Sequence, residues 1–525
     1  MGRFSVARRS KRVNAAMAAS LASLFLVLLP CSGSSAPSLP SAEELRDHTA
    51  QAAGSEPQSQ QYSIAFTIGA TSGVRHTARR GGDFRTAVDE GPLHSESGSL
   101  GGVAWRQNEN GETIVARREP GLAQREALTT SVERSPPPLT GYVLATLDAT
   151  GYGTKLYVDG ATWRIVRREV VARSGTTVTV YDDFRRVGGF ERAWHWLTDD
   201  GHPENRGEYR LLSASDAAVG DAELAIPADR RKVVQFPPAT QSAALPVSFS
   251  GGQIFVRVNI GSRAVDFLLD TGASEIAIDE NVAQQLGLPL YGVHSYAGSA
   301  RRFSGGRVIV PEMRIGPLTM HDVVAITVPS VNVSSGKRRA VGLLGFDFID
   351  ALGLKIDYAR GAVDAVPSEA FVPPAAATVL EARLEGGSPQ VDVRVNGALG
   401  ERFVIDTGNS GSFLIFDFFA RRYPGALVDL GGGGGRDRRF RGIGGSVQTA
   451  PYQLETIDLA GFQFHDFVGY RVLATSEFAI NDDGLIGSDL LRYFDLYVDY
   501  AHSRLYLAPN DLGRGLLSLP PARAS

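Results

Sequence analysis

Alternating apolar and polar residues fill the first part of the chain. The stretch Ile64–Ile68 alternates with a period of two. Further on, Asn110-Gly111 separates the runs Val103–Trp105 and Thr113–Val115, and an Asn-Gly pair in this position is typical of a β-hairpin. Alternation of this kind buries one face of a sheet and leaves the other in water. We therefore predict a curved antiparallel sheet within residues 41–230.

Two apolar runs later in the chain each end in an acidic turn. Residues Val265–Leu269 lead into Asp270-Thr271-Gly272, and a further apolar run follows. Residues Phe403–Ile405 lead into Asp406-Thr407-Gly408 in the same way. A carboxylate at the tip of a buried strand is costly unless it is hydrogen-bonded or shares its charge with a partner. We expect each aspartate to be the partner of the other.

Both turns belong to a longer internal repeat, whose two copies are offset by about 140 residues. A period of this length indicates a duplicated domain rather than an array of short repeats. The matched pairs are Val256–Asn259 with Val393–Asn396, Val341–Ile349 with Asp483–Leu491, and Leu354–Ala359 with Leu496–Ala501.

The repeat and two proline-bearing connections divide the chain, which is too long for a single hydrophobic core. Pro237-Pro238 lies in the first connection and Pro373-Pro374 in the second. We predict a signal segment at 1–36, an N-terminal β-rich domain at 41–230, a linker at 231–246, and two lobes at 247–366 and 378–510.

Composition limits the classes of function. The 525 residues are 43% apolar and 21% charged, as in a folded globular protein, and the formal net charge is −4. This charge gives no reason to expect nucleic acid or an anionic membrane surface as a partner. The nine histidines lack zinc-binding spacing, and a single cysteine, Cys31, excludes an internal disulfide and a thiolate metal site. We expect no metal and no other cofactor.

The first 36 residues have the features of an export signal. Basic residues come first, the apolar stretch Leu21–Leu29 follows, and small residues end near Ala36. A second interpretation is a lipoprotein cleavage box ending at Cys31, which would then be acylated, although Pro30 fits that box poorly. The apolar stretch is too short for a permanent membrane helix, and no later run approaches the length of a span. We expect an exported protein, periplasmic or extracellular, with a lipid-anchored form as the alternative.

The duplicated turns resemble those of the aspartic peptidases, in which two homologous lobes each supply one Asp-Thr-Gly loop. The resemblance covers about residues 245–507 and includes the segments Leu343–Gly345 and Leu485–Gly487, which are apolar and end in glycine. It implies a bilobal β fold with Asp270 and Asp406 as the catalytic pair. The pair would share one proton and activate a water that attacks a peptide bond.

The same resemblance implies how the loops are supported. Thr271 and Thr407 would hydrogen-bond across the axis between the lobes, while Gly272 and Gly408 allow a tight turn and close backbone approach. The compact halves are similar to bacterial relatives of the retropepsins, but one chain carries both, so we expect activity as a single chain. Which aspartate is ionised stays open, because the titration belongs to the pair.

Two features of the predicted site leave alternatives open. The residue after glycine is Ala273 in the first loop and Asn409 in the second. The Asn409 amide either donates a hydrogen bond to the outer oxygen of Asp406 or crowds the loop, so a strongly acidic optimum is not assumed. Glycine-bearing stretches at Tyr296–Gly306 and at Phe440–Gly445, the latter preceded by Gly431–Gly435, are either flaps over the cleft or flexible surface loops.

The N-terminal domain carries no catalytic motif. Ser41–Glu44 resembles a capping box that opens a short helix ending near Gly54. Residues Tyr157–Glu169 and Tyr181–Val187 resemble in pattern the half-barrel of bacterial lipoprotein carriers. That resemblance implies a concave face that shelters an acyl chain or a lipoprotein. A structural or substrate-recruiting β-domain is the alternative.

Taken together, the motifs predict a mainly β, exported aspartic endopeptidase that acts on peptide or protein substrates. Two alternatives stay open. One is a binding protein whose protease-like fold no longer cleaves, and the other is a lipid or lipoprotein carrier that acts through the N-terminal domain. Fold analogy alone does not separate them, because function is determined by the site.

Overall fold

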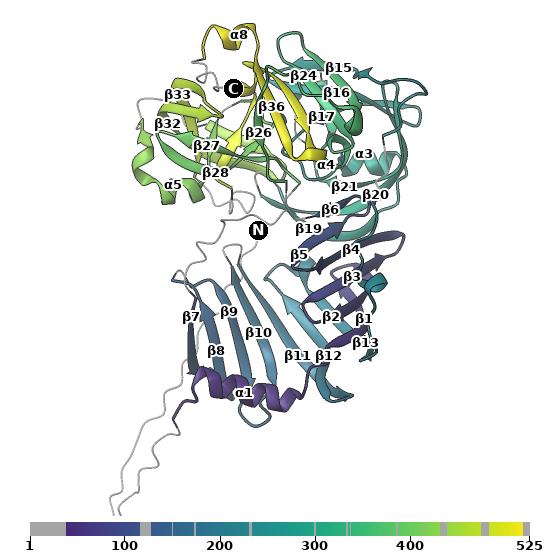
Figure 1. Ribbon diagram of the computed structural model, residues 1–525, viewed down its shortest axis with the longest axis vertical. Coiled ribbons are helices and arrows are strands. Elements are labelled where there is room, and N and C mark those ends of the chain that lie inside the picture. Colours follow the sequence, from purple (N-terminus) through teal and green to yellow (C-terminus); the bar gives the residue numbers. More distant parts are fainter. Residues whose placement is uncertain are drawn as a thin grey trace, which may run out of the picture.

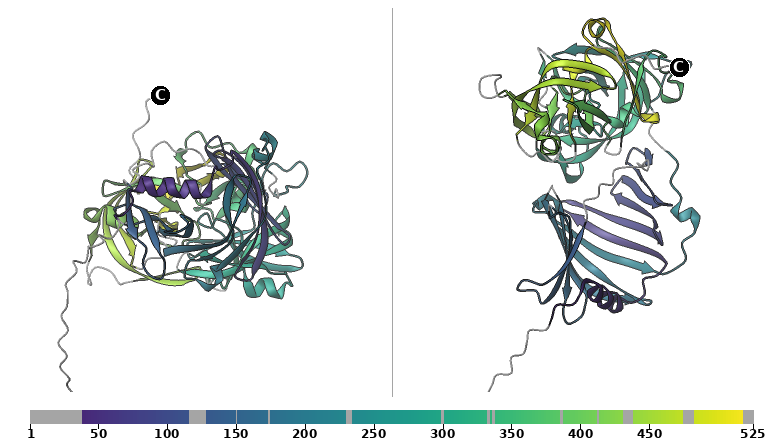
Figure 2. Two further views of the ribbon diagram at one scale, coloured as in Figure 1. Left: turned by 90° about the horizontal axis from the view of Figure 1, so that it is seen from below. Right: turned by 60° about the vertical axis from the view of Figure 1, so that its left-hand side comes forward.

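A computed structural model describes residues 38–115, 128–149, 151–172, 175–229, 234–298, 301–331, 334–335, 338–384, 387–411, 413–430, 438–473 and 482–517. These residues form a mainly β protein. A curved sheet lies at one end and two β-rich lobes at the other (Figure 1), and the second view of Figure 2 shows the same division. The predicted signal segment, Cys31 and the glycine run at 431–435 lie outside the described residues.

The N-terminal sheet is one antiparallel sheet of thirteen strands within the described residues. Strand order is β6-β5-β4-β3-β2-β1-β13-β12-β11-β10-β9-β8-β7, so β1 and β13 join two meanders. The strands are β1 (Ser59–Ile68), β2 (Thr71–Arg80), β3 (Asp83–Glu90), β4 (Leu93–Leu100), β5 (Val103–Gln107), β6 (Thr113–Val115), β7 (Thr129–Arg134), β8 (Gly141–Leu147), β9 (Gly153–Asp159), β10 (Ile165–Ala172), β11 (Gly175–Val187), β12 (Phe190–Asp199) and β13 (Gly207–Ser215).

Helix α1 (Ala42–Ala53) lies across the end of the sheet farthest from the lobes (Figures 1 and 2). Ser41 and Glu44 form the predicted capping box, and the helix ends at Gly54, where φ is +88°. Its one fully buried side chain, Leu45, packs against Leu144 and Val158. The local prediction for this helix is therefore confirmed.

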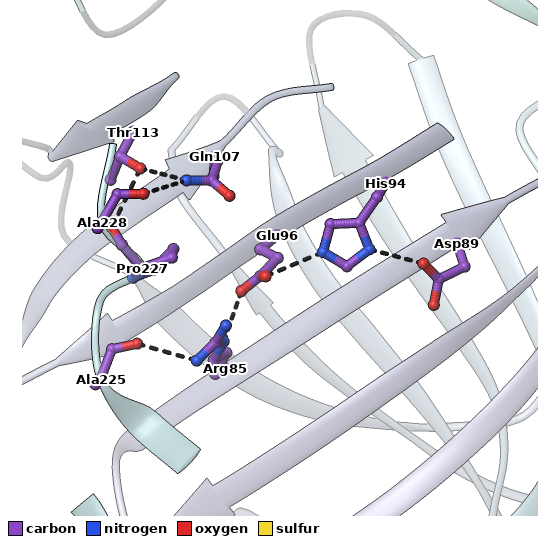
Figure 3. Close-up of polar contacts among 9 residues, drawn as sticks. All are labelled: Arg85, Asp89, His94, Glu96, Gln107, Thr113, Ala225, Pro227 and Ala228. Atoms are coloured by element: carbon purple, nitrogen blue, oxygen red, sulfur yellow. Dashed lines mark hydrogen bonds and ion pairs between the residues drawn. The ribbon is translucent and has the colours of Figure 1, made fainter. Parts of the chain in front are cut away.

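The segment that leaves the sheet runs back along its outer strands (Figure 3). Helix α2 (Asp221–Leu224) comes first, and residues 225–228 then accept hydrogen bonds from the sheet. Gln107 Nε2 donates to the carbonyl of Ala228 at 2.9 Å, and Arg85 Nη1 donates to that of Ala225 at 3.4 Å. Arg85 also pairs with Glu96 at 2.6 Å. The start of the connection to the lobes is thus fastened to β3 and β5.

Lobe 1 is a sheet of nine strands within the described residues, in the order β15-β16-β17-β23-β18-β21-β20-β19, with β22 paired to β23. Its elements are β15 (Val247–Ser250), β16 (Gln253–Ile260), β17 (Arg263–Leu269), β18 (Ala277–Asp279), α3 (Glu280–Gln285), β19 (Tyr291–Ala297), β20 (Arg302–Ile315), β21 (Leu318–Val328), β22 (Ser334–Ser335), β23 (Arg338–Leu344) and α4 (Phe346–Ile349).

Lobe 2 repeats this order as β27-β28-β34-β29-β33-β32-β30, with β31 paired to β32. The parallel pairs β17–β23 and β28–β34 correspond, and each delivers one aspartate. The elements are β27 (Gln390–Val395), β28 (Ala398–Ile405), β29 (Leu414–Ile415), α5 (Asp417–Arg422), β30 (Val428–Asp429), β31 (Arg438–Gly442), β32 (Gly445–Leu459), β33 (Phe462–Val472), β34 (Gly484–Ile486) and α7 (Ser488–Leu491).

A six-stranded antiparallel sheet joins the lobes, in the order β14-β25-β24-β35-β36-β26. The central pair β24–β35 crosses between them, with Leu354 opposite Val498 and Ile356 opposite Leu496. All four side chains belong to one apolar core that continues through both lobes. The strands are β14 (Ala243–Ala244), β24 (Leu352–Asp357), β25 (Ala362–Pro367), β26 (Thr378–Glu381), β35 (Phe494–Asp499) and β36 (Arg504–Pro509), and α8 (Asp511–Arg514) follows.

Candidate active site

The two predicted aspartates follow the ends of β17 and β28. Asp270 N–H donates to the carbonyl of Leu344 at 3.1 Å, and Asp406 N–H donates to that of Ile486 at 3.0 Å. The two bonds continue the parallel pairs β17–β23 and β28–β34 by one residue beyond the ends of β17 and β28. Each chain then turns sharply, so the same local geometry is built twice. The duplication predicted from the sequence thus extends to single hydrogen bonds.

Backbone N–H groups bind each carboxylate within its own loop. Gly272 N–H donates to Asp270 Oδ1 at 2.9 Å, and Asn409 N–H donates to Asp406 Oδ1 at 3.0 Å. The side-chain amide oxygen of Asn409 accepts a hydrogen bond from Gly411 N–H at 3.3 Å, which turns the side chain along its own loop. From the sequence, only the side-chain amide of Asn409 was considered as a donor to Asp406. Its backbone N–H, which is the donor to Asp406 Oδ1, was not identified.

The two glycines face the aspartate of the opposite loop. A Cβ atom on Gly272 would lie 2.7 Å from Asp406 Cγ, and one on Gly408 would lie 2.5 Å from Asp270 Cγ. No real Cβ contact is this short, so a side chain at either position would displace a carboxyl group. Glycine is therefore required here for close approach.

The two threonines exchange hydrogen bonds across the axis. Thr271 N–H donates to Thr407 Oγ1 at 3.1 Å, and Thr407 N–H donates to Thr271 Oγ1 at 3.0 Å. Each hydroxyl in turn donates to the other lobe, Thr271 to the carbonyl of Ile405 at 2.7 Å and Thr407 to that of Leu269 at 2.8 Å. Both side chains are fully buried, so these four bonds are shielded from water and hold the two loops together.

Two further supporting residues were not identified from the sequence. Gln253 Nε2 donates to the carbonyl of Gly408 at 2.7 Å, and Ser388 Oγ donates to that of Gly272 at 2.9 Å. Each residue braces the loop of the opposite lobe. Both follow a Gly-Gly pair at nearly the same distance before their own aspartate, a signal that the repeat contained.

The matched segments Leu354–Ala359 and Leu496–Ala501 each carry a tyrosine whose hydroxyl is buried near the loops, and the two hydroxyls differ in their contacts. The hydroxyl of Tyr500 donates to the carbonyl of Thr271 at 3.3 Å. Among the described residues, the equivalent hydroxyl of Tyr358 is buried without a hydrogen-bond partner. The pseudo-twofold symmetry is therefore incomplete beneath the pair of aspartates.

The carboxyl groups of Asp270 and Asp406 share a hydrogen bond, which makes them one titrating unit. Burial raises the pKa of Asp270, although hydrogen bonds from Asp406 and from the loop backbone offset part of that rise. Burial and the charge of Asp270 together raise the pKa of Asp406 well above its ordinary value. Two carboxylates that share a hydrogen bond oppose each other's ionisation, so the pair keeps its last proton to a higher pH than a single exposed carboxyl group would.

A cleft of about 710 Å³ lies over the pair, between the lobes. Its lining is mixed. Leu268, Phe303 and Leu343 from lobe 1 and Leu414 and Tyr470 from lobe 2 supply apolar surface, and polar side chains such as Gln253, Glu275 and Asp489 lie among them. Such a groove offers both apolar surface and hydrogen-bonding groups to a ligand.

Two hairpins meet over the cleft. The lobe-1 hairpin consists of β19 and β20, and the lobe-2 hairpin consists of β31 and β32. Their tips are in contact: a Cβ on Gly298 would lie 2.5 Å from the carbonyl oxygen of Ile443, and one on Gly444 would lie 2.1 Å from that of Arg301. Ile443 also packs into the apolar cluster of lobe 1. These are the stretches for which the sequence left flaps and surface loops as alternatives.

Among the described residues, no group of three or more His, Cys, Asp or Glu side chains is arranged to hold a metal ion. No helix in the described part of the chain is long and apolar enough to span a membrane.

Comparisons with known proteins agree with the sequence resemblance. An aspartyl protease family model matches residues 256–348 and 391–490, which contain Asp270 and Asp406. No curated protein sequence matches the chain.

Solved structures match different parts of the chain. An aspartic proteinase from Irpex lacteus is 14% identical and covers 52% of this chain and 98% of its own, with a TM-score of 0.32. Basic 7S globulin from soybean is 12% identical over 52% of this chain and 96% of its own, with a TM-score of 0.33. A LolA superfamily protein from Nitrosomonas europaea is 13% identical over 35% of this chain and 97% of its own, with a TM-score of 0.28. On the evidence of the two matched segments, the lobes of this chain belong to the aspartyl protease family.

Proposed function

We propose that this chain is an aspartic endopeptidase that cleaves peptide bonds with a water held between Asp270 and Asp406. The observation that carries the proposal is the hydrogen-bonded pair of buried carboxyl groups beneath a cleft of about 710 Å³. Paired carboxylates of this kind supply both a base and an acid at one point, as is established for aspartic proteases.

The ionised member of the pair accepts a proton from the bound water, which then attacks the carbonyl carbon of the scissile bond. The protonated member donates a hydrogen bond to the carbonyl oxygen as negative charge develops there. The proton taken from water is then available for the leaving amine, so the pair returns to its starting state. The hydrogen bonds of Thr271 and Thr407 keep both carboxyl groups in place throughout.

A cleavage assay on a mixed peptide library, read by mass spectrometry, tests the proposal. Asp270→Asn and Asp406→Asn should each abolish cleavage while the protein stays folded. The double variant should be little worse than either single one, because the residues act as a unit. Asp392→Asn is the matched control, since Asp392 lies in lobe 2 outside the cleft lining and pairs with Arg383. If either aspartate variant keeps most of the activity, the shared mechanism is wrong. If the wild type cleaves no peptide in the library, a protease-like binding protein becomes the better description.

We further propose that the chain is exported, either to the periplasm or out of the cell. Support comes from the basic and apolar pattern of residues 1–36. Cell fractionation followed by N-terminal sequencing of the mature protein tests this proposal. A mature chain that begins near Pro37 supports cleavage, an acylated Cys31 supports the lipid-anchored form, and an intact Met1 in the cytoplasm contradicts both.

The domain boundaries are part of the same proposal. We take residues 41–230 as an N-terminal domain, 231–246 as the linker, and 247–366 and 378–510 as the lobes. Limited proteolysis should first cut within residues 238–242 of this linker, which are mostly exposed and precede β14, and release two folded pieces. An early cut inside either lobe would contradict this division.

A further inference from the structure

The lobe-1 hairpin carries a bulge close to its base. Tyr291 pairs with Arg307, and the next pair is His294 with Gly305, so Gly292 and Val293 together face Gly306. A bulge of this kind leaves backbone groups without partners in the ladder. The groups of Val293 must therefore find partners elsewhere, because unpaired backbone groups are costly away from water.

A threonine of the N-terminal sheet supplies those partners. Val293 N–H donates to Thr71 Oγ1 at 2.8 Å, and Thr71 Oγ1 lies 3.5 Å from the carbonyl of Val293. Thr71 is only 3% exposed. Gly292 has a φ of +60°, and a Cβ there would lie 2.8 Å from Thr71 Oγ1. The bulge and the threonine therefore fit closely, although 222 residues separate Thr71 from Val293.

A contact between a histidine and a carboxylate lies beside this one. His294 Nε2 lies 3.1 Å from Glu90 Oε2, at the end of β3. Burial raises the pKa of Glu90, but the hydrogen bond from His294, together with nearby positive charges that include Arg307 and Arg75, outweighs burial and leaves that pKa below its ordinary value. The preceding residue, Asp89, pairs with His94 at 2.7 Å (Figure 3), so the same end of β3 is held within the sheet.

A second contact reaches the other strand of the hairpin and the Asp270 loop. Arg307, on β20, lies 3.4 Å from Glu109 of the N-terminal sheet and 3.5 Å from Glu275, which lines the cleft. Arg307 Nη1 also donates to the hydroxyl of Tyr296 at 3.1 Å, beneath the hairpin tip. One cation thus connects the N-terminal sheet, the lobe-1 hairpin and the cleft wall.

The turn that contains Glu109 is itself fixed to lobe 1. Asn110 exchanges two hydrogen bonds with the backbone of Val324, at 3.0 and 2.9 Å. Asn108 Nδ2 donates to Asp347 Oδ1 at 2.8 Å, and Asp347 Oδ2 accepts from Ile276 N–H at 3.2 Å. This chain of contacts ends directly behind the loop that carries Asp270.

We propose that the N-terminal sheet helps to shape the cleft: Thr71, Glu90 and Glu109 are positioning residues that hold the lobe-1 hairpin over Asp270. The inference rests on the proposed peptidase function for its effect on catalysis. It assigns the N-terminal domain a role in substrate binding within this same chain.

Hydrogen exchange of the full chain tests the physical contact without any assay of activity. In Thr71→Val the N–H of Val293 loses its acceptor and should exchange roughly tenfold faster. Thr71→Ser keeps a hydroxyl and should restore the slow rate. Thr77→Val is the matched control, because Thr77 lies on the same strand and bonds Thr86, at 2.9 Å within the sheet. Unchanged exchange at Val293 in Thr71→Val overturns the inference.

Steady-state kinetics test the consequence for the cleft. Thr71→Val and Glu90→Gln should each raise KM by roughly threefold to tenfold with kcat little changed, because a displaced hairpin weakens substrate binding. A variant that is merely less stable contains fewer active molecules, which lowers the apparent kcat and leaves KM unchanged. A lower kcat with an unchanged KM would therefore overturn the positioning role. Glu96→Gln is the control, since Glu96 pairs with Arg85 and His94 inside the sheet (Figure 3).

The two proposals fail in different ways. If Asp270→Asn does not reduce cleavage, the proposed function is wrong, while the exchange of Val293 still tests the contact. If the aspartate variants behave as expected but Thr71→Val changes neither exchange nor KM, this inference alone is wrong.

Discussion

At the scale of single residues, the site depends on the lack of a side chain at two glycines as much as on the carboxyl groups. Gly272 and Gly408 leave room for the opposite aspartate, and a Cβ at either position would lie under 3 Å from a carboxyl carbon. Neither glycine has a positive φ, so the requirement comes from space rather than from backbone conformation.

Gly272→Ala should therefore disable the pair without unfolding the protein. The added methyl group displaces Asp406, and a shift of about 1 Å at the reacting groups costs at least about 100-fold in kcat/KM. Gly411→Ala is the matched control in the same cleft, because its Cβ would lie 3.6 Å from the nearest atom, an ordinary contact. Equal kcat/KM for Gly272→Ala and wild type would contradict this account of the loop.

The shared proton predicts how activity depends on pH. The active form has one proton on the pair, so activity rises as the first carboxyl ionises and falls as the second does. Both pKa values are raised above the ordinary 3.8, and that of Asp406 is raised further. Both limbs of a bell-shaped profile in kcat/KM should lie above pH 3.8, and so should the maximum between them. A maximum below about pH 3 would contradict this prediction.

At the scale of elements, local signals predicted local structure. The Ser41–Glu44 capping box and the Asn110-Gly111 hairpin both occur where the sequence indicated, because each depends on residues within a few positions of one another. The apolar runs before Asp270 and Asp406 likewise became buried strands.

Contacts between distant elements were not predictable in this way. Gln253 reaches Gly408 across 155 residues, and Asn110, read only as a turn residue, bonds Val324 across 214. No periodicity in the sequence encodes such pairings, since they depend on how separate sheets come together. The repeat did hold one usable signal, the Gly-Gly pair before Gln253 and before Ser388.

Asp347, which accepts a hydrogen bond from the turn of residues 108–111, should make the free energy of unfolding depend on pH. Burial and the nearby Glu275 raise the pKa of this carboxyl from 3.8 to about 7. The folded state therefore favours the protonated form: its contribution to stability is complete below pH 3.8 and is lost as pH rises through about 7.

Asp347→Asn should remove that part of the pH dependence. Between about pH 5 and about pH 8, the free energy of unfolding should fall by about 1–2 kcal/mol more in wild type than in the variant. This difference is smaller than the full pKa shift implies, because the Asp347 side chain is only partly buried and keeps some contact with solvent. Denaturant unfolding at the two pH values measures the difference. Parallel pH dependence in the two proteins would show that Asp347 is not the group responsible.

At the scale of the whole molecule, the chain contains both halves of one site. Residues 243–367 supply β14, β24 and β25 of the shared sheet, and residues 378–509 supply β26, β35 and β36. The central pair β24–β35 and the apolar core beneath it hold the lobes together. The threonine hydrogen bonds then fix the two loops. Assembly of the pair of aspartates is thus an intramolecular event.

Specific activity per chain should therefore stay constant on dilution to nanomolar concentrations. A peptidase that pairs two chains loses activity below its dimer dissociation constant, whereas a tethered partner has an effective concentration that dilution does not change. A fragment that ends near Val366 should be inactive alone, because it lacks Asp406 and half of the shared sheet. Adding the fragment 378–525 should restore part of the activity by re-forming the β24–β35 pair. Activity that falls steeply on dilution, with adsorption to surfaces excluded by carrier protein, would show that two chains form the active unit and that the lobes of one chain do not close on each other.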